Sequence, residues 1–273
     1  MITTLLRHEF LRTRAMLGVI FGAAAALTAV GALLGVLGWP VLDVLGITIA
    51  GIAIACLVPG VMLALALDYY RSSYQGPGYL TQTLPIRSRT IYGAKLLWTL
   101  LASFAGLLVS VLLLGLLWPA LAAGQGLDPN PFAMVATLWD AATQLTSAWT
   151  LIGAIALLVL SLLAYMPMWL AAMSIGSEER FQRFGHGGPV IVAALLYTVT
   201  QVLFAIGIFA VPFAFGSTPD GGLGIIRFDA VQELIASQDA TVVPLGFIPM
   251  VFLLAAWAIW RTARSWHRKV ALT

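Results

Sequence analysis

Long apolar blocks with almost no charged residues dominate this sequence and restrict the folds open to it. A helix needs about 20 apolar residues to cross a bilayer, and six blocks of the chain are about that long or longer. The predicted spans are residues 16–38, 45–67, 94–118, 146–175, 189–215 and 242–260. The sequence therefore predicts an all-α integral membrane protein, with residues 1–273 forming a single transmembrane domain.

The composition points to lipid as the solvent of this chain. Charged residues make up 9% of it, whereas soluble domains average roughly 25%. With 61% hydrophobic residues, the folded chain would expose more apolar surface than a soluble protein tolerates. The single cysteine, Cys56, excludes an internal disulfide.

The basic residues predict an orientation in the membrane. When the spans alternate across the bilayer, all of the 14 lysines and arginines except Arg227 fall on one side. Cytoplasmic segments of membrane proteins carry such an excess of positive charge. We therefore expect both termini and the loops 68–93 and 176–188 to be cytoplasmic, in a multi-pass protein of the plasma membrane.

Residues 1–15, before the first span, predict an amphipathic helix. Apolar residues recur there at helical spacing, and the arginines lie mostly away from that stripe. The stripe consists of Ile2, Leu5, Leu6 and Phe10, and the arginines are Arg7, Arg12 and Arg14. A basic amphipathic helix of this kind is expected to lie along the membrane surface.

Two long external segments, residues 119–145 and 216–241, connect the outer ends of the spans. Each contains a helix-like stretch: FAMVATLWDAATQL after Pro131, and FDAVQELIASQ after Arg227. Two interpretations remain open, namely short external or re-entrant helices packed on the spans, or structured loops without such helices.

The spans lack the groups that usually drive transport or catalysis. Ion-driven transporters generally need an ionisable residue inside the membrane. Here the one charge is Lys95, at the edge of span 94–118, where we expect anionic headgroups to hold it. No phosphate-binding loop or catalytic motif is present, so we expect no catalytic residue, metal or cofactor in this chain. Uncharged polar side chains remain as a candidate translocation route: Thr99, Ser103, Tyr165, Thr198 and Gln201.

Residues 68–95 form the longest polar run that carries several positive charges, and they join the second and third spans. Gly76-Pro77-Gly78 is expected to end the helix that leaves the second span. A short helix is then predicted over residues 79–84, with Pro85 ending it. Four tyrosines here are suited to fill a pocket on another protein: Tyr69, Tyr70, Tyr74 and Tyr79.

Residues 78–97, GYLTQTLPIRSRTIYGAKLL, resemble the segment that follows the second span in type-2 ABC transporter permeases. Members of that family often read roughly G-x-L-T-L-x-L-P-[IV]-S-R-x-x-[IL]-x-x-[GS]-K-L. The positions that fit are Gly78, Leu80, Thr81, Leu84, Pro85, Ile86, Arg89, Gly93, Lys95 and Leu96. Arg87-Ser88-Arg89 departs from the pattern, in which Ser-Arg alone is commoner, and this affects the local register. The six-span layout and the basic N-terminal helix also match.

The resemblance implies the membrane part of an ATP-driven exporter of a bacterial cell. Similar permeases sit in membrane lipid and pair with a second permease copy or a related permease. They also pair with two cytosolic ATPase subunits, which bind the ATP and Mg²⁺; no nucleic acid is involved. The loop near 69–90 would place a coupling helix in a cleft of the ATPase, and residues 176–187 would make a smaller contact. The coupling residues that this implies are Arg71, Tyr74, Tyr79, Leu80, Thr81, Leu84, Pro85, Arg87 and Arg89.

The cargo implied is hydrophobic or amphipathic, such as a drug, an antimicrobial peptide or a lipid. Two other functions remain open. A self-contained secondary transporter or channel can bind sodium through the carbonyls of broken helices, without a charged residue. A non-transporting sensor or assembly subunit would share the same six-span layout.

Overall fold

A computed structural model describes residues 2–37, 39–75, 88–185, 187–218, 222–232 and 242–268. Within them, six helices are long and apolar enough to cross a membrane: Ile2–Leu34, Pro40–Tyr74, Ser88–Ala123, Ala148–Gly176, Gly187–Ala210 and Phe247–Trp266. A helical, multi-pass membrane architecture is confirmed at this level. The chain divides into two compact units, Met1–Leu138 (unit 1) and Trp139–Thr273 (unit 2), and the single-domain interpretation stays a prediction.

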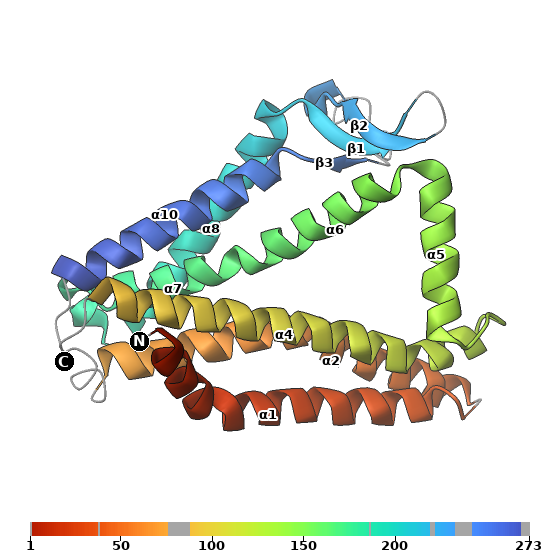
Figure 1. The fold of residues 1–273 in the computed structure, drawn as a ribbon, viewed down its shortest axis with the longest axis horizontal. Helices are drawn as coiled ribbons and strands as arrows, with labels where there is room; N and C mark the ends of the chain where they lie inside the picture. The colour runs from red at the N-terminus through yellow and green to blue at the C-terminus, as the bar shows by residue number, and fades with distance from the viewer. Residues whose placement is uncertain are drawn as a thin grey trace. The chain divides into compact units, whose positions relative to one another are not determined.

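Unit 1 is a bundle of α1 (Ile2–Leu34), α2 (Pro40–Tyr74) and α4 (Ser88–Ala123), each packed against the other two (Figure 1). Glycines set the closest approach within it. The backbones of Gly31 on α1 and Gly46 on α2 lie so near each other that a side chain at either position would collide with the opposite helix. Small residues allow helices to associate in lipid, where no hydrophobic force drives helices together.

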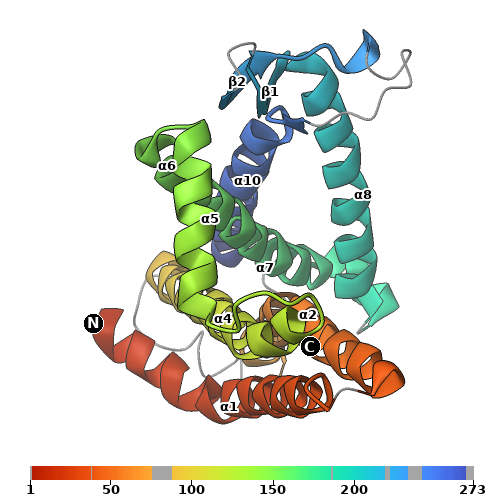
Figure 2. The ribbon, with the colours of Figure 1, turned by 90° about the vertical axis from the view of Figure 1, so that its right-hand side faces the viewer.

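The predicted surface helix 1–15 is not a separate element. Helix α1 begins at Ile2 and continues through the first span to Leu34. Composition changes near Met16, but residues 2–34 contain no proline, so the backbone hydrogen bonds of the helix can continue through this point. Both views show the first turns of α1 running in a different direction from the rest of the helix (Figures 1 and 2). The position of these turns along a membrane surface stays a prediction.

A further helix, α5 (Pro131–Leu145), follows α4 and coincides with the first helix-like stretch predicted outside the membrane. The turn before it is fixed by two hydrogen bonds. The indole Nε1 of Trp118 donates to the carbonyl oxygen of Asp128 at 2.9 Å, and Asn130 Oδ1 accepts from the backbone N–H of Phe132 at 3.0 Å. Asn130 thus acts as the N-terminal cap, and Pro131 takes the first helical position, which suits its missing N–H.

Unit 2 contains α6 (Ala148–Leu163), α7 (Tyr165–Gly176), α8 (Gly187–Ala210) and α10 (Phe247–Arg268), with a 3₁₀ helix, η1 (Glu179–Phe184), after α7. The fourth predicted span is therefore two helices that meet at Ala164. Pro167 explains the interruption, because it has no N–H to donate to the carbonyl of Leu163 and its ring crowds that carbonyl. Helices α7, α8 and α10 pack against one another (Figures 1 and 2).

The predicted ends of the fifth and sixth spans are wrong. Helix α8 stops at Ala210, and residues predicted as helical in 211–215 and 242–246 contribute to a small antiparallel sheet. Its strands are β1 (Phe213–Ser217), β2 (Leu223–Arg227) and β3 (Val243–Pro244), in the order β2-β1-β3. Pro212 has no N–H with which to extend α8, and Val243 is disfavoured from helical backbone angles because it precedes Pro244. Apolar composition alone does not separate a helix from a strand. Most of the helix-like stretch predicted after Arg227 lies outside the described residues.

Candidate functional site

The predicted coupling segment is described only at its two ends. Tyr79, Leu80, Thr81, Leu84, Pro85 and Arg87 lie outside the described residues. Arg71 and Arg89 are described, and both are exposed, near the end of α2 and the start of α4. These two cations are therefore accessible to another protein or to lipid headgroups. The structure shows in detail how the helices on either side of the segment are held.

A cluster of charged residues joins the ends of those helices to α1. The guanidinium of Arg12 on α1 lies between two carboxylates: its Nη2 is 2.5 Å from Glu9 Oε2 and 2.5 Å from Asp68 Oδ2. Because Asp68 belongs to α2, Arg12 links the first helix to the helix that leads into the segment. A planar guanidinium shared by two carboxylates is a directional contact, and it restricts rotation of both helices.

Lys95 completes this cluster from α4. Its side chain is buried, with its Nζ 2.8 Å from Ser72 Oγ on α2 and 3.4 Å from Glu9 Oε1 on α1. The expectation that headgroups hold Lys95 is therefore wrong. Two acids and two bases balance in charge, as buried ionic groups require. We call Glu9, Arg12, Asp68, Ser72 and Lys95 the inner charge cluster.

Hydrogen bonds and aromatic contacts surround the inner charge cluster. Trp98 Nε1 on α4 donates to Thr13 Oγ1 at 3.0 Å, and Thr13 Oγ1 in turn donates to the carbonyl oxygen of Glu9 at 2.9 Å. On α2, the hydroxyls of Tyr69 and Tyr74 lie 3.3 Å apart, and both rings are buried. Tyr74 therefore faces its own chain, and its burial argues against a direct contact with another protein.

In unit 2, a second ionic contact fixes the short loop after α7. Glu178 is buried, and its Oε1 accepts hydrogen bonds from Arg261 Nη2 at 2.6 Å and from Ser265 Oγ at 2.9 Å. Both donors belong to α10, so the loop is tied to the last helix. Where the loop closes, the backbone of Gly176 contacts that of Gly188, and neither position has room for a side chain.

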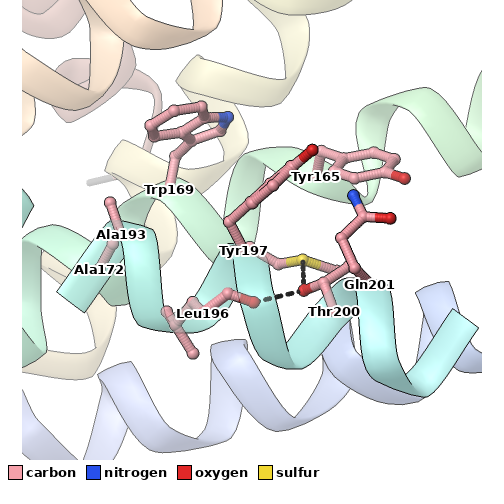
Figure 3. A pocket seen from close by; sticks show the side chains of 9 residues that line it. Tyr165, Trp169, Ala172, Ala193, Leu196, Tyr197, Thr200 and Gln201 are labelled. Carbon is pink, nitrogen blue, oxygen red and sulfur yellow. Dashed lines mark hydrogen bonds between the residues drawn. The ribbon is translucent and has the colours of Figure 1, made fainter. Parts of the chain in front are cut away.

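A cavity of about 100 Å³ lies between α7 and α8 (Figure 3). Its walls are apolar and aromatic, and no charged group lines it. The lining residues are Tyr165, Met168, Trp169, Ala172, Ala193, Leu196, Tyr197, Thr200 and Gln201. Figure 3 shows the amide of Gln201 beside the ring of Tyr165, with the ring of Tyr197 close by. The Thr200 hydroxyl donates to the carbonyl of Leu196 at 2.7 Å, which leaves the phenols and the amide as hydrogen-bonding groups for a ligand.

The structure brings together two of the five residues predicted for a translocation route. Tyr165 and Gln201 line this cavity, whereas Thr198 is exposed and donates to the carbonyl of Ala194 at 3.0 Å. Thr99 and Ser103 belong to α4 in unit 1, where both are buried. Trp169 and Tyr197 were not predicted, although their spacing from Tyr165 and Gln201 on a helix would have placed them on the same faces.

Comparison with known proteins found no counterpart for this arrangement. No protein-family model, no curated protein and no solved structure matched the chain. Among the described residues, no three His, Cys, Asp or Glu side chains are grouped so that they would hold a metal ion. The function is therefore argued from the sequence pattern and from the geometry above.

Proposed function

We propose that this chain is the permease subunit of an ATP-driven exporter and that separate ATPase subunits act on it through the segment between α2 and α4. The observation that carries the proposal is the inner charge cluster. It bonds the end of α2 and the beginning of α4 to each other and to α1. A displacement of the segment therefore moves three membrane helices together.

The strength of these contacts supports this role. Glu9 and Lys95 are almost completely buried, and removing one partner of a buried ion pair typically costs about 3–5 kcal/mol. Separating the buried Glu9 and Lys95 is therefore costly, so we expect the helix ends that carry them to move together, whereas exposed ion pairs contribute only about 0–1 kcal/mol. Such joint movement is what a segment needs if it transmits the work of ATP hydrolysis to the spans without melting locally.

The cavity between α7 and α8 supports a hydrophobic or amphipathic cargo. Its aromatic walls offer dispersion contacts, and its phenols and amide offer uncharged hydrogen-bonding groups. A charged cargo would lose its hydration there without gaining a counter-charge. Drugs, antimicrobial peptides and lipids with a large apolar part fit this chemistry.

Photo-cross-linking in native membranes tests the proposed docking. A photoreactive amino acid replaces Tyr79 or Leu84 in the segment. The matched control replaces Ile225, an exposed residue of β2 that the order of the predicted spans assigns to the other side of the membrane. We expect positions 79 and 84, but not 225, to capture a protein that binds and hydrolyses ATP. Capture of no ATP-binding protein at either position would contradict the proposal.

Two substitutions extend this test to coupling. Tyr79→Asp and Leu84→Asp should release or uncouple the ATPase while the spans remain folded, and Ile225→Asp should change neither. A self-contained secondary transporter predicts a different outcome, because the purified chain alone would then move cargo in liposomes under an ion gradient without any ATPase.

A further inference from the structure

Helix α5 has one face that is entirely apolar, and most of this face is exposed in the described structure. With a helical repeat of about 100° per residue, one half of its circumference carries the large apolar residues. These are Phe132, Met134, Val135, Leu138, Trp139 and Leu145. None of the helix's 15 residues is buried, and the side chain of Phe132 is 83% exposed.

The opposite half of α5 is small or polar. It carries Ala133, Ala136, Thr137, Asp140, Ala141, Thr143 and Gln144. Asp140 is the only charged residue in the helix, and there is no basic residue. The helix therefore has the division into two faces that is typical of helices lying in a membrane interface, but not the lysines and arginines that recruit such helices to anionic lipids.

The geometry of unit 1 gives the direction of α5 relative to a neighbouring candidate span. α5 is connected at both ends to candidate spans, Ser88–Ala123 before it and Ala148–Gly176 after it. Its first half, which belongs to unit 1, runs across the axis of α4 in both views (Figures 1 and 2). If α4 crosses the membrane, α5 is therefore directed along the membrane plane.

Several tryptophans lie near the span ends that the chain order assigns to the same side of the membrane as α5. Trp39 precedes α2, Trp118 lies in the last turns of α4, and Trp149 is the second residue of α6. Trp39 and Trp149 are 68% and 82% exposed. Indole rings gather where hydrocarbon meets the headgroups, and Trp139 of α5 adds a further ring to this set.

We propose that α5 is an interfacial helix whose apolar face is buried in the membrane leaflet opposite the N-terminus. The partner is a lipid surface, and attachment depends on apolar burial rather than on anionic headgroups. This attachment holds the connection between the third and fourth candidate spans at the surface. It does not depend on the proposed transport function.

Site-directed spin labelling of the full chain in phosphatidylcholine nanodiscs tests this proposal. In a Cys56→Ser background, single cysteines at positions 131–145 carry the label, and collision rates with oxygen and with a water-soluble nickel complex are measured. We expect the two rates to oscillate out of phase with a period of about 3.6 residues. Oxygen should dominate at 132, 135 and 138, with a depth of about 5–10 Å below the headgroups. Nickel should dominate at 137, 140 and 144.

Each alternative occupant gives a distinct result. Protection of positions 132, 135 and 138 from both reagents would mean that protein covers the apolar face, and it would overturn the proposal. Nickel access on both faces would mean that α5 lies in water, with the same consequence. Adding anionic phosphatidylglycerol should leave the pattern unchanged, and a pattern that appears only with anionic lipid would contradict attachment by apolar burial.

Discussion

Neutralising Lys95 in the inner charge cluster is the perturbation whose effect the structure predicts most sharply. Lys95→Met keeps the apolar stem but leaves Glu9, Asp68 and Arg12 with a net charge of −1, and the Glu9 carboxylate among them is buried. Loss of one partner from a buried pair costs about 3–5 kcal/mol of the free energy of unfolding. The matched control is Arg89→Met, an exposed cation six residues earlier on α4, where a change within about 0.5 kcal/mol is expected.

A double variant separates charge balance from packing. Glu9→Gln combined with Lys95→Met restores neutrality, because Arg12 and Asp68 still pair. The double variant should therefore be more stable than the sum of the single effects predicts, by an interaction energy of about 0.5–3 kcal/mol. Unfolding in mixed micelles of increasing SDS content, followed by tryptophan fluorescence, measures these free energies. Additive effects, or a Lys95→Met variant as stable as Arg89→Met, would refute the inner charge cluster as a stabilising junction.

Three further substitutions test other contacts. Gly46→Leu should destabilise unit 1 by about 1–3 kcal/mol or more through overpacking against α1, whereas Gly51→Leu, with open space around it, should be tolerated in the same unfolding assay. Arg261→Met should cost about 3–5 kcal/mol because it removes a guanidinium from a buried carboxylate, and the exposed Arg264 provides the control; equal effects would contradict this. Ala193→Trp should fill the cavity between α7 and α8 and reduce export of a hydrophobic dye without reducing ATPase co-purification, and unchanged export would argue against the cavity as part of the route.

Hydropathy predicted the spans because the requirement for about 20 apolar residues is local in the sequence. It misjudged the end of α8 and the start of α10, where Pro212 follows the last turn of α8 and Pro244 stands in strand β3. Composition could not reveal that difference, since a short apolar run suits a strand as well as a helix. The prolines themselves were the available signal.

The inner charge cluster could not be predicted from the sequence pattern, for a different reason. Arg12 and Asp68 are 56 residues apart, and Trp98 and Thr13 are 85 apart, so only the packing of α1, α2 and α4 brings them together. One signal was present. A lysine at the edge of an apolar block either reaches the headgroups or pairs with a buried acid, and the sequence alone does not distinguish the two. A helix at the position of α5 could be predicted because its cap, its proline and its periodicity all lie within a short stretch of the sequence.

The accessibility of position 81 shows whether another protein acts on the segment between α2 and α4 from the cytoplasm. In a Cys56→Ser background, Thr81→Cys is exposed to a membrane-impermeant maleimide in right-side-out vesicles, in inside-out vesicles and in inside-out vesicles stripped of peripheral proteins. We expect labelling only in stripped inside-out vesicles, with protection restored when the ATPase fraction is added back. Labelling in right-side-out vesicles, or equal labelling before and after stripping, would contradict it.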